Sequence, residues 1–432
     1  MPLEYRSNSN SFFRVILIFL VVIVPLVVLF LLMRQIYQKE LYKPLLSQFV
    51  NGRKLSLSDY RKLYRIYGIN IRDKDENTLL HRLTVKACFQ KISPYPFLIE
   101  LLKKGLSPNE RNAKGQTPIH LAAAYCRDEE VLKELLSLFL KFKGDINARD
   151  CAGNTPLFYT IDYATFDSQL KVLLRFKPDV NTKNYYGWTP LCKATLFDLG
   201  YQFSVLQRAG ADIYESCGEI SIPQLAKTLK SGHVIYYLEK LGIDVKNVKE
   251  VKGNVRRLLF NPLSNNLCVC VRKDFESNLK KVLTYSIIFD EAERVKAFYE
   301  HSLLSPRDKL DGRSPVLLAA TRGLFCSPKV LDYFITAGFA KPNEKFKKGK
   351  TLLHICAGRG CDECVRILVK RGARVDVEDN RRFTPYCEAV ANGRERIAEE
   401  LLRLGANPDA PCVKVARRLK DLNGWLEETT VK

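Results

Sequence analysis

The sequence predicts an all-α fold, a solenoid of helix–turn–helix units preceded by one N-terminal transmembrane helix. Three observations support this prediction. A short motif that starts a helix recurs along the chain, a helix-ending glycine follows most copies of it, and one long apolar run lies near the N-terminus. One such unit cannot bury its own apolar face, whereas a row of stacked units can. We therefore expect one elongated array rather than two or three separate domains.

The clearest copy of the motif is KGQTPIHLAAA at residues 114–124. Thr117 is a good N-cap, and Pro118 suits the first helical position, where its missing N–H would have no partner. A second apolar run at residues 131–140 precedes Gly144, a typical helix stop. Each unit is therefore predicted to be helix, turn, helix and glycine turn. Further copies, 33 to 39 residues apart within each group, start at Thr78, Thr155, Thr189, Ser314, Thr351 and Thr384.

A period of about 33 residues with a TPLH-like start resembles the ankyrin repeat. The resemblance covers residues 75–410 and implies an architecture made of paired helices. In ankyrin proteins, partners usually contact the turn tips before each motif and the exposed end of the first helix, which together line the concave face. Carried onto this chain, the resemblance implies partner contacts at Tyr125, Tyr163, Tyr185, Tyr186, Phe197, Arg322, Phe346, Lys347, Lys348, Arg359, Arg381 and Arg382.

The N-terminus carries a tail at residues 1–14 and then 19 uncharged, mostly apolar residues at 15–33. As a helix, this run would be about 28 Å long, close to the hydrocarbon thickness of a bilayer. We expect a transmembrane helix, and hence a single-pass membrane protein. A cleaved signal peptide is the alternative, but its apolar core is normally shorter and is followed by a small-residue cleavage site. More basic residues follow the run than precede it, which predicts a cytoplasmic repeat domain.

The remaining chain divides into four kinds of segment. Residues 34–74 are predicted to form a helical linker and N-terminal cap, and residues 411–432 a C-terminal cap. Clear ankyrin repeats are expected at 75–247 and 311–410. The pattern fades at residues 248–310, where we expect degenerate repeats, with an inserted functional element as the alternative.

Charge and cysteine content bound the partners and the compartment. A net charge of +22 favours acidic proteins or anionic lipids, although a merely solvated basic surface would have the same composition. We do not expect nucleic acid as a partner. Thirteen cysteines without a short disulfide framework predict free, buried thiols in a reducing compartment.

Catalytic and metal-binding patterns were sought, and none is convincing. His81, His120 and His354 each stand three residues after a motif Thr, a position at which ankyrin histidines resemble turn-stabilising hydrogen-bonders. Cys361 and Cys364 form a C-x-x-C motif, but a zinc site needs a second pair at matching spacing. No phosphate loop or zincin motif occurs. The sequence therefore predicts a protein that is not an enzyme and uses no metal or cofactor.

The leading functional hypothesis is a membrane-anchored scaffold that binds a protein partner on its concave face and recruits it to a membrane. A second hypothesis makes the array a basic surface that docks on anionic lipids through Lys347, Lys348 and Lys350. An enzyme within residues 248–310 is a third, disfavoured by the lack of a catalytic set. Ankyrin proteins with an added membrane span also resemble bacterial effectors that act on host proteins.

Overall fold

The structure is a computed structural model that describes residues 24–90, 95–163, 167–260, 269–321 and 326–430. The chain divides into two compact units. The first unit comprises residues 1–160 and 165–178, and the second comprises residues 161–164 and 179–432.

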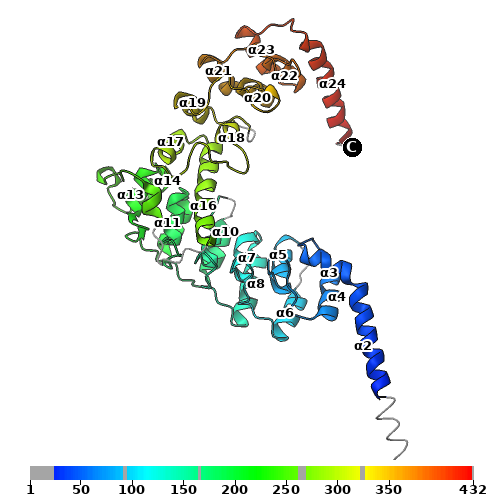
Figure 1. Cartoon of the computed structure of the whole chain (residues 1–432). Helices are drawn as coiled ribbons and strands as arrows, with labels where there is room; N and C mark the ends of the chain where they lie inside the picture. The colour runs from blue at the N-terminus through cyan, green and yellow to red at the C-terminus, as the bar shows by residue number, and fades with distance from the viewer. Residues whose placement is uncertain (1–23, 91–94, 164–166, 261–268, 322–325, 431–432) are drawn as a thin grey trace, which may run out of the picture. The chain divides into compact units, whose positions relative to one another are not determined.

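The first unit is built from short helices, drawn in blue to cyan in Figure 1. Its inner helices α5, α7 and α9 pack one on the next, and the outer helix α8 packs against α7 and α10. The helices are α2 (Val24–Leu41), α3 (Lys43–Val50), α4 (Leu57–Tyr67), α5 (Leu79–Phe89), α6 (Tyr95–Lys103), α7 (Pro118–Tyr125), α8 (Glu129–Lys141), α9 (Pro156–Tyr159) and α10 (Asp167–Leu174).

The second unit continues the same alternation of inner and outer helices. Its inner helices α18, α20, α22 and α24 pack in sequence, as do the outer helices α17, α19, α21 and α23. Figure 1 shows these two rows from yellow to red. The first elements are α11 (Pro190–Leu196), α12 (Gly200–Arg208), β1 (Ser216–Cys217), β2 (Ile220–Ser221), α13 (Ile222–Thr228), α14 (Gly232–Lys240), η2 (Val245–Asn247), α15 (Val255–Leu259) and α16 (Val269–Ile288). The others are α17 (Ala292–Glu300), α18 (Pro315–Thr321), α19 (Pro328–Thr336), η3 (Lys347–Gly349), α20 (Leu352–Arg359), α21 (Asp362–Lys370), α22 (Pro385–Ala391), α23 (Glu395–Arg403) and α24 (Cys412–Thr430).

The motif residues start the inner helices as predicted. Helix α7 begins at Pro118, with Thr117 as its N-cap. The Nδ1 atom of His120 accepts a hydrogen bond from the Thr117 N–H (3.1 Å), so its Nε2–H donates to the carbonyl of Asn154 in the next repeat (3.1 Å). Because that donor needs a neutral ring in a fixed tautomer, the histidine connects one repeat to the next. The expected turn-stabilising role of these histidines is confirmed.

The same cross-repeat bond occurs at two other copies of the motif. His81 bonds the carbonyl of Gln116 at 2.9 Å, and His354 bonds that of Phe383 at 2.8 Å. All three imidazoles are fully buried. Burial lowers the pKa of His81 and of His120 to about 4 and also lowers that of His354, because the charged form loses hydration.

The predicted transmembrane helix is not supported. Residues 15–23 of the predicted span lie outside the described residues, and α2 begins at Val24. Its apolar part ends at Met33, because Arg34, Lys39 and Glu40 follow within the same helix. Across the described ranges, no helix is both long and apolar enough to cross a membrane. This finding overturns the prediction of a single-pass membrane protein with its repeats in the cytoplasm.

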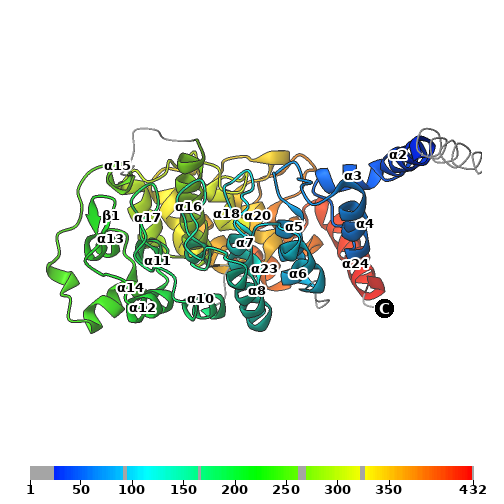
Figure 2. The same cartoon turned by 90° about the horizontal axis from the view of Figure 1, so that it is seen from below.

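The long helix α16 lies where the repeat pattern fades in the sequence. It packs against α17 and α18, as Figure 2 shows. Its N-terminal half buries Phe275 against Trp188, with ring centroids 5.4 Å apart. The indole N–H of Trp188 donates to the carbonyl of Leu259 at 2.9 Å, which fixes the end of α15 on the preceding repeats.

Helix α17 is fixed to the repeats by one buried cation. Arg294 is 2% exposed and donates hydrogen bonds to the Leu196 carbonyl and to the Ser231 hydroxyl. Its guanidinium also lies 3.4 Å from the buried carboxylate of Asp198 and 3.8 Å from Glu291. Asp198 in turn accepts hydrogen bonds from the first N–H groups of α14. A single side chain therefore connects the outer helices of two neighbouring repeats.

The sequence predicted free thiols, but several of the cysteines form disulfides. Within the described ranges, disulfides include Cys88–Cys126, Cys192–Cys217, Cys326–Cys361 and Cys387–Cys412. Cys356 and Cys364 are free and buried, as predicted for thiols packed between helices. The paired cysteines are 25 to 38 residues apart in the chain. Such spacings show no framework in the sequence, and only the stacking of repeats brings the members of each pair together.

Gly218, in the turn between β1 and β2, offers a direct test of local packing. Its φ is +65°, and a Cβ atom there would overlap the carbonyl oxygens of Leu258 and Leu259. Gly210 also has a positive φ (+94°), but nothing lies within 4 Å of its Cβ position. We expect Gly210→Ala to cost about 1 kcal/mol from backbone strain alone, and Gly218→Ala about 2 kcal/mol more, because the hairpin must move off α15. Urea unfolding of both variants measures the difference, and equal costs would contradict the predicted overlap.

Candidate partner-binding surface

Two of the predicted contact residues lie in the core. Tyr186 and Phe197 are both 0% exposed. The Tyr186 ring packs edge-on against Trp188 (4.8 Å between centroids), and its hydroxyl donates to Asp274 at 2.8 Å. Neither side chain can meet a partner from solvent, so both are removed from the predicted surface.

Tyr163 is half-buried in an aromatic cluster. Its ring lies 4.3 Å from that of Tyr285 and 5.6 Å from that of Phe197, and its hydroxyl donates to the Phe197 carbonyl. Burial raises the pKa of Tyr163 well above its ordinary value. Its main contacts are therefore within the protein. Arg322 lies outside the described residues.

Two other predicted aromatics are accessible to solvent. Tyr125 is 46% exposed at the end of α7 and lies 6.1 Å from Phe89, which is also exposed. Tyr185 is 39% exposed in the second unit. Tyr125 belongs to the first unit.

Five of the remaining predicted residues lie on two adjacent turn tips of the second unit. In the first tip, the Phe346 N–H bonds the Lys350 carbonyl (2.8 Å), which leaves Lys347 and Lys348 at the apex. In the second tip, the Asp379 N–H donates to the Phe383 carbonyl (2.8 Å), and Arg381 and Arg382 lie between these two residues. The Asn380 N–H donates to the Lys348 carbonyl at 3.1 Å and holds the two tips side by side.

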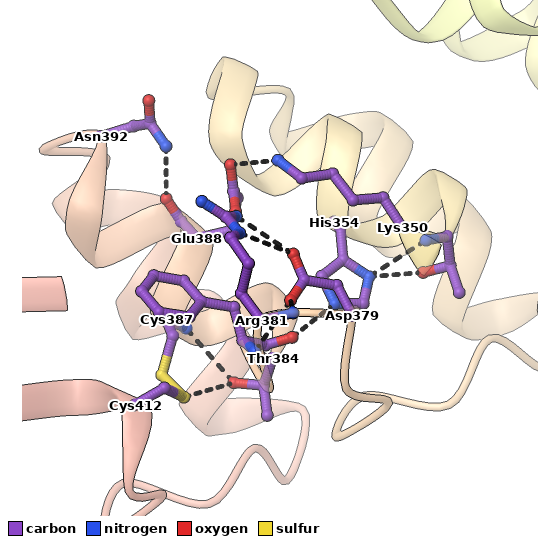
Figure 3. Close-up of polar contacts among 11 residues, drawn as sticks. Lys350, His354, Asp379, Arg381, Thr384, Cys387, Glu388, Asn392 and Cys412 are labelled. Atoms are coloured by element: carbon purple, nitrogen blue, oxygen red, sulfur yellow. Dashed lines mark hydrogen bonds and ion pairs between the residues drawn. A yellow bond between two sulfur atoms is a disulfide. The ribbon is translucent and has the colours of Figure 1, made fainter. Parts of the chain in front are cut away.

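A carboxylate on the adjacent inner helix organises these tips. Glu388 of α22 is 9% exposed and accepts one hydrogen bond from Lys350 and one from Arg381, both at 2.6 Å. Figure 3 shows both cations converging on Glu388. The Arg381 guanidinium also lies 4.6 Å above the ring of Phe383 and 3.0 Å from Asp379. Arg381 therefore has a fixed position and remains about half exposed.

Asp379 shapes the second tip through its buried carboxylate. One oxygen accepts hydrogen bonds from the N–H groups of Arg381 (2.7 Å) and Phe383 (3.0 Å). Burial alone would raise the pKa of Asp379. The backbone N–H groups and the Arg381 guanidinium outweigh burial and hold the pKa below its ordinary value. The tip therefore keeps a charged carboxylate beneath its two arginines.

Other cations at these tips are not compensated. The side chains of Lys347, Lys348 and Arg382 are exposed and have no hydrogen-bond or ion-pair partner in the described part of the chain. The same holds for Arg359, at the C-terminal end of α20. Arg359 is therefore separated from the tips by the length of α20. We call the following residues the basic tip surface: Lys347, Lys348, Arg381 and Arg382. Phe346, at the base of the first tip, is half-buried.

The sequence interpretation missed Asp379 and Glu388. A signal for the first was present, because an Asp or Asn stands five residues before most motif Thr residues and accepts backbone N–H groups of the turn. Phe346 takes this position in the repeat of Thr351, where the tip forms the short 3-10 turn η3 instead. These turn residues are Asp73, Asn112, Asp150, Asn184 and Asp379. No comparable signal marked Glu388, whose role depends on side chains from two tips.

The described residues contain no group of three or more His, Cys, Asp or Glu side chains that could hold a metal ion. The basic tip surface offers positive charge, hydrogen-bond donors and one half-buried ring. Such a surface is suited to binding acidic groups.

Comparison with known proteins identifies the repeats. Residues 318–412 match the family model for ankyrin repeats in three copies, and residues 114–151 match the model for a single ankyrin repeat. These segments are ankyrin repeats. The basic tip surface lies within the three matched copies. Ankyrin repeats are typically non-enzymatic modules for protein–protein interaction, with extended binding surfaces.

Individual relatives share only part of this ankyrin array. An ankyrin repeat-containing protein of Schizosaccharomyces pombe is 41% identical over 61 residues, which are 14% of this chain and 27% of that protein. The B-cell lymphoma 3 protein homolog of Mus musculus is 30% identical over 115 residues, 26% of this chain and 25% of the relative. The chain thus spans about a quarter of the length of these curated relatives.

Among solved structures, the ankyrin repeat domain of Bcl-3, a member of the IkappaB protein family, aligns with 53% of this chain and 97% of its own chain. The sequence identity is 21% and the TM-score 0.39.

Proposed function

We propose that this ankyrin array is a scaffold that binds an acidic segment of a protein partner through its basic tip surface. The observation that carries the proposal is the presence of three unpaired cations, Lys347, Lys348 and Arg382, on two adjacent tips that are hydrogen-bonded to each other. In a folded chain, unpaired like charges repel each other at some cost in stability. A partner that brings carboxylates would remove that repulsion and gain charge-assisted hydrogen bonds.

The fixed geometry of Arg381 supports the same proposal. Glu388, Asp379 and the Phe383 ring hold its guanidinium in place, so binding would not have to order a flexible side chain. Arginine held in this way is a residue type that often dominates binding energy at interfaces. Lys347, Lys348 and Arg382 would then add attraction and faster association around it.

The test is a titration of the full chain with a fluorescein-labelled 15-residue peptide rich in Glu, followed by fluorescence anisotropy at low salt. The triple variant Lys347→Glu/Lys348→Glu/Arg382→Glu should bind at least about tenfold more weakly, because three contacts of about 0.5–1 kcal/mol are lost. Raising the ionic strength should weaken binding of the unchanged chain, because exposed charges are screened.

The matched control changes three basic residues of the first unit, Arg65→Glu/Lys103→Glu/Lys104→Glu, which alters the net charge by the same amount. It should lower the affinity less than about threefold, since screening removes most long-range effects. A peptide with Gln in place of Glu should not bind. Equal affinity of the tip variant and the unchanged chain would refute the proposal.

A further inference from the structure

The four disulfides named above all join neighbouring repeats rather than two points in one repeat. Cys88 and Cys126 lie at the ends of the consecutive inner helices α5 and α7, with Cα atoms 4.4 Å apart. Cys326 and Cys361 precede the consecutive outer helices α19 and α21, with Cα atoms 5.9 Å apart. Neighbouring helices usually lie 8–10 Å apart, so adjacency alone does not bring two Cα atoms within disulfide range.

The other two disulfides occupy a position that carries a different connection elsewhere in the array. Cys192 and Cys387 each stand three residues after a motif Thr, where three other repeats have histidine. Those histidines bond the turn that enters the next inner helix. Cys192 instead forms its disulfide with Cys217, and Cys387 with Cys412, each 25 residues further along, just before or at the start of the next inner helix.

In these five repeats, the same position therefore connects the repeat to its neighbour either by a buried imidazole or by a disulfide. Burial supports this equivalence, because Cys192, Cys217, Cys387 and Cys412 are all less than 9% exposed. A thiol at this position cannot replace the imidazole, since it has no atom that reaches the next carbonyl as Nε2 does. The repeats of Thr189 and Thr384, which have cysteine at this position, are connected there only when the cysteines are oxidised.

We infer that this ankyrin array folds and works in an oxidising compartment, where these four cysteine pairs are disulfides. Each pair loses two protons and two electrons as its S–S bond forms. A thiol–disulfide oxidoreductase accepts them, and its own disulfide becomes a dithiol. Reducing compartments keep such pairs as thiols. The inference replaces the reducing compartment that the cysteine spacing suggested.

The test uses the full chain isolated from its own cells, with free thiols blocked by iodoacetamide during lysis. After digestion without reductant, mass spectrometry should find four linked peptide pairs: Cys88–Cys126, Cys192–Cys217, Cys326–Cys361 and Cys387–Cys412. The free thiols Cys356 and Cys364 should be alkylated once the chain is denatured. Alkylation of the eight cysteines in these four pairs would overturn the inference.

A second measurement shows whether the bonds stabilise the array. Adding reductant to the oxidised full chain should lower its Tm by at least about 10 °C, because several loops of 25 to 38 residues are released. The control Cys356→Ser should show the same fall, since Cys356 is a free thiol. The variant Cys192→Ser/Cys217→Ser should show a smaller fall in Tm on reduction, because it has one disulfide fewer to lose. An unchanged Tm on reduction would count against a structural role for the bonds.

Discussion

Lowering the pH from 7 to 5 is expected to destabilise the first unit by about 4 kcal/mol. His81 and His120 are fully buried there, and burial lowers the pKa of each from the ordinary value of 6.5 to about 4. In the unfolded chain both rings take up a proton as the pH falls below 6.5, whereas in the folded chain they stay neutral until about pH 4. Stability is therefore lost between those values, by about 2 kcal/mol per histidine at pH 5.

The physical reason lies in the cross-repeat bond. A protonated His120 would need an acceptor for its Nδ1–H, but that atom faces the N–H of Thr117. The measurement is urea unfolding of the full chain at both pH values, with hydrogen exchange of peptides from residues 79–125 as the local probe.

The control removes the titrating groups and keeps a donor to the carbonyl. His81→Gln/His120→Gln should flatten the pH dependence of exchange in this region, because glutamine does not titrate. His301→Gln, at the end of α17 in the second unit, should leave the pH dependence of exchange in residues 79–125 unchanged. Equal stability of residues 79–125 at pH 7 and pH 5 in the unchanged chain would show that the imidazoles are not held neutral.

Arg294→Met should destabilise the second unit by about 3–5 kcal/mol. The change leaves the Asp198 carboxylate, 8% exposed, without its buried cation, and it removes the donor to the Leu196 carbonyl. Breaking a buried ion pair from one side costs more than the pair itself contributes, because an uncompensated charge stays in the interior. Methionine keeps most of the apolar stem, so the effect is electrostatic rather than a cavity.

Lys296→Met on the same helix is the matched control. Lys296 is 44% exposed and lies 3.9 Å from Glu300, so its loss should cost less than about 0.5 kcal/mol. Urea unfolding of the two variants provides the comparison, with hydrogen exchange of residues 292–300 reporting on α17. A cost for Arg294→Met as small as that of the control would mean that solvent reaches Asp198 and compensates its charge.

The repeat units were predictable because their signals are local. Thr117, Pro118 and His120 lie within four residues of one another, and each acts through the backbone nearby. The exposure of Arg381 and Arg382 followed from their place at a turn tip for the same reason.

The burial of Tyr186 was not predictable in this way. Its partners Asp274 and Asn278 lie about 90 residues away on α16, in a segment without a recognisable motif. Cys192 and Cys217 posed the same problem, because their pairing depends on how one repeat stacks on the next. The apolar run at residues 15–33 predicted a spanning helix, but the structure describes only residues 24–33 of that run, and no helix in the described ranges is long and apolar enough to cross a membrane.

The different connections between repeats have a mechanical consequence. Under a pulling force, a contact held by an imidazole hydrogen bond ruptures and lets the helices unravel, whereas the Cys192–Cys217 bond does not break. That bond withholds 25 residues from extension, about 85 Å of contour length. A stretched array would lengthen in steps where a histidine hydrogen bond connects two repeats. It would not lengthen where a disulfide connects them until a reductant cleaves that disulfide.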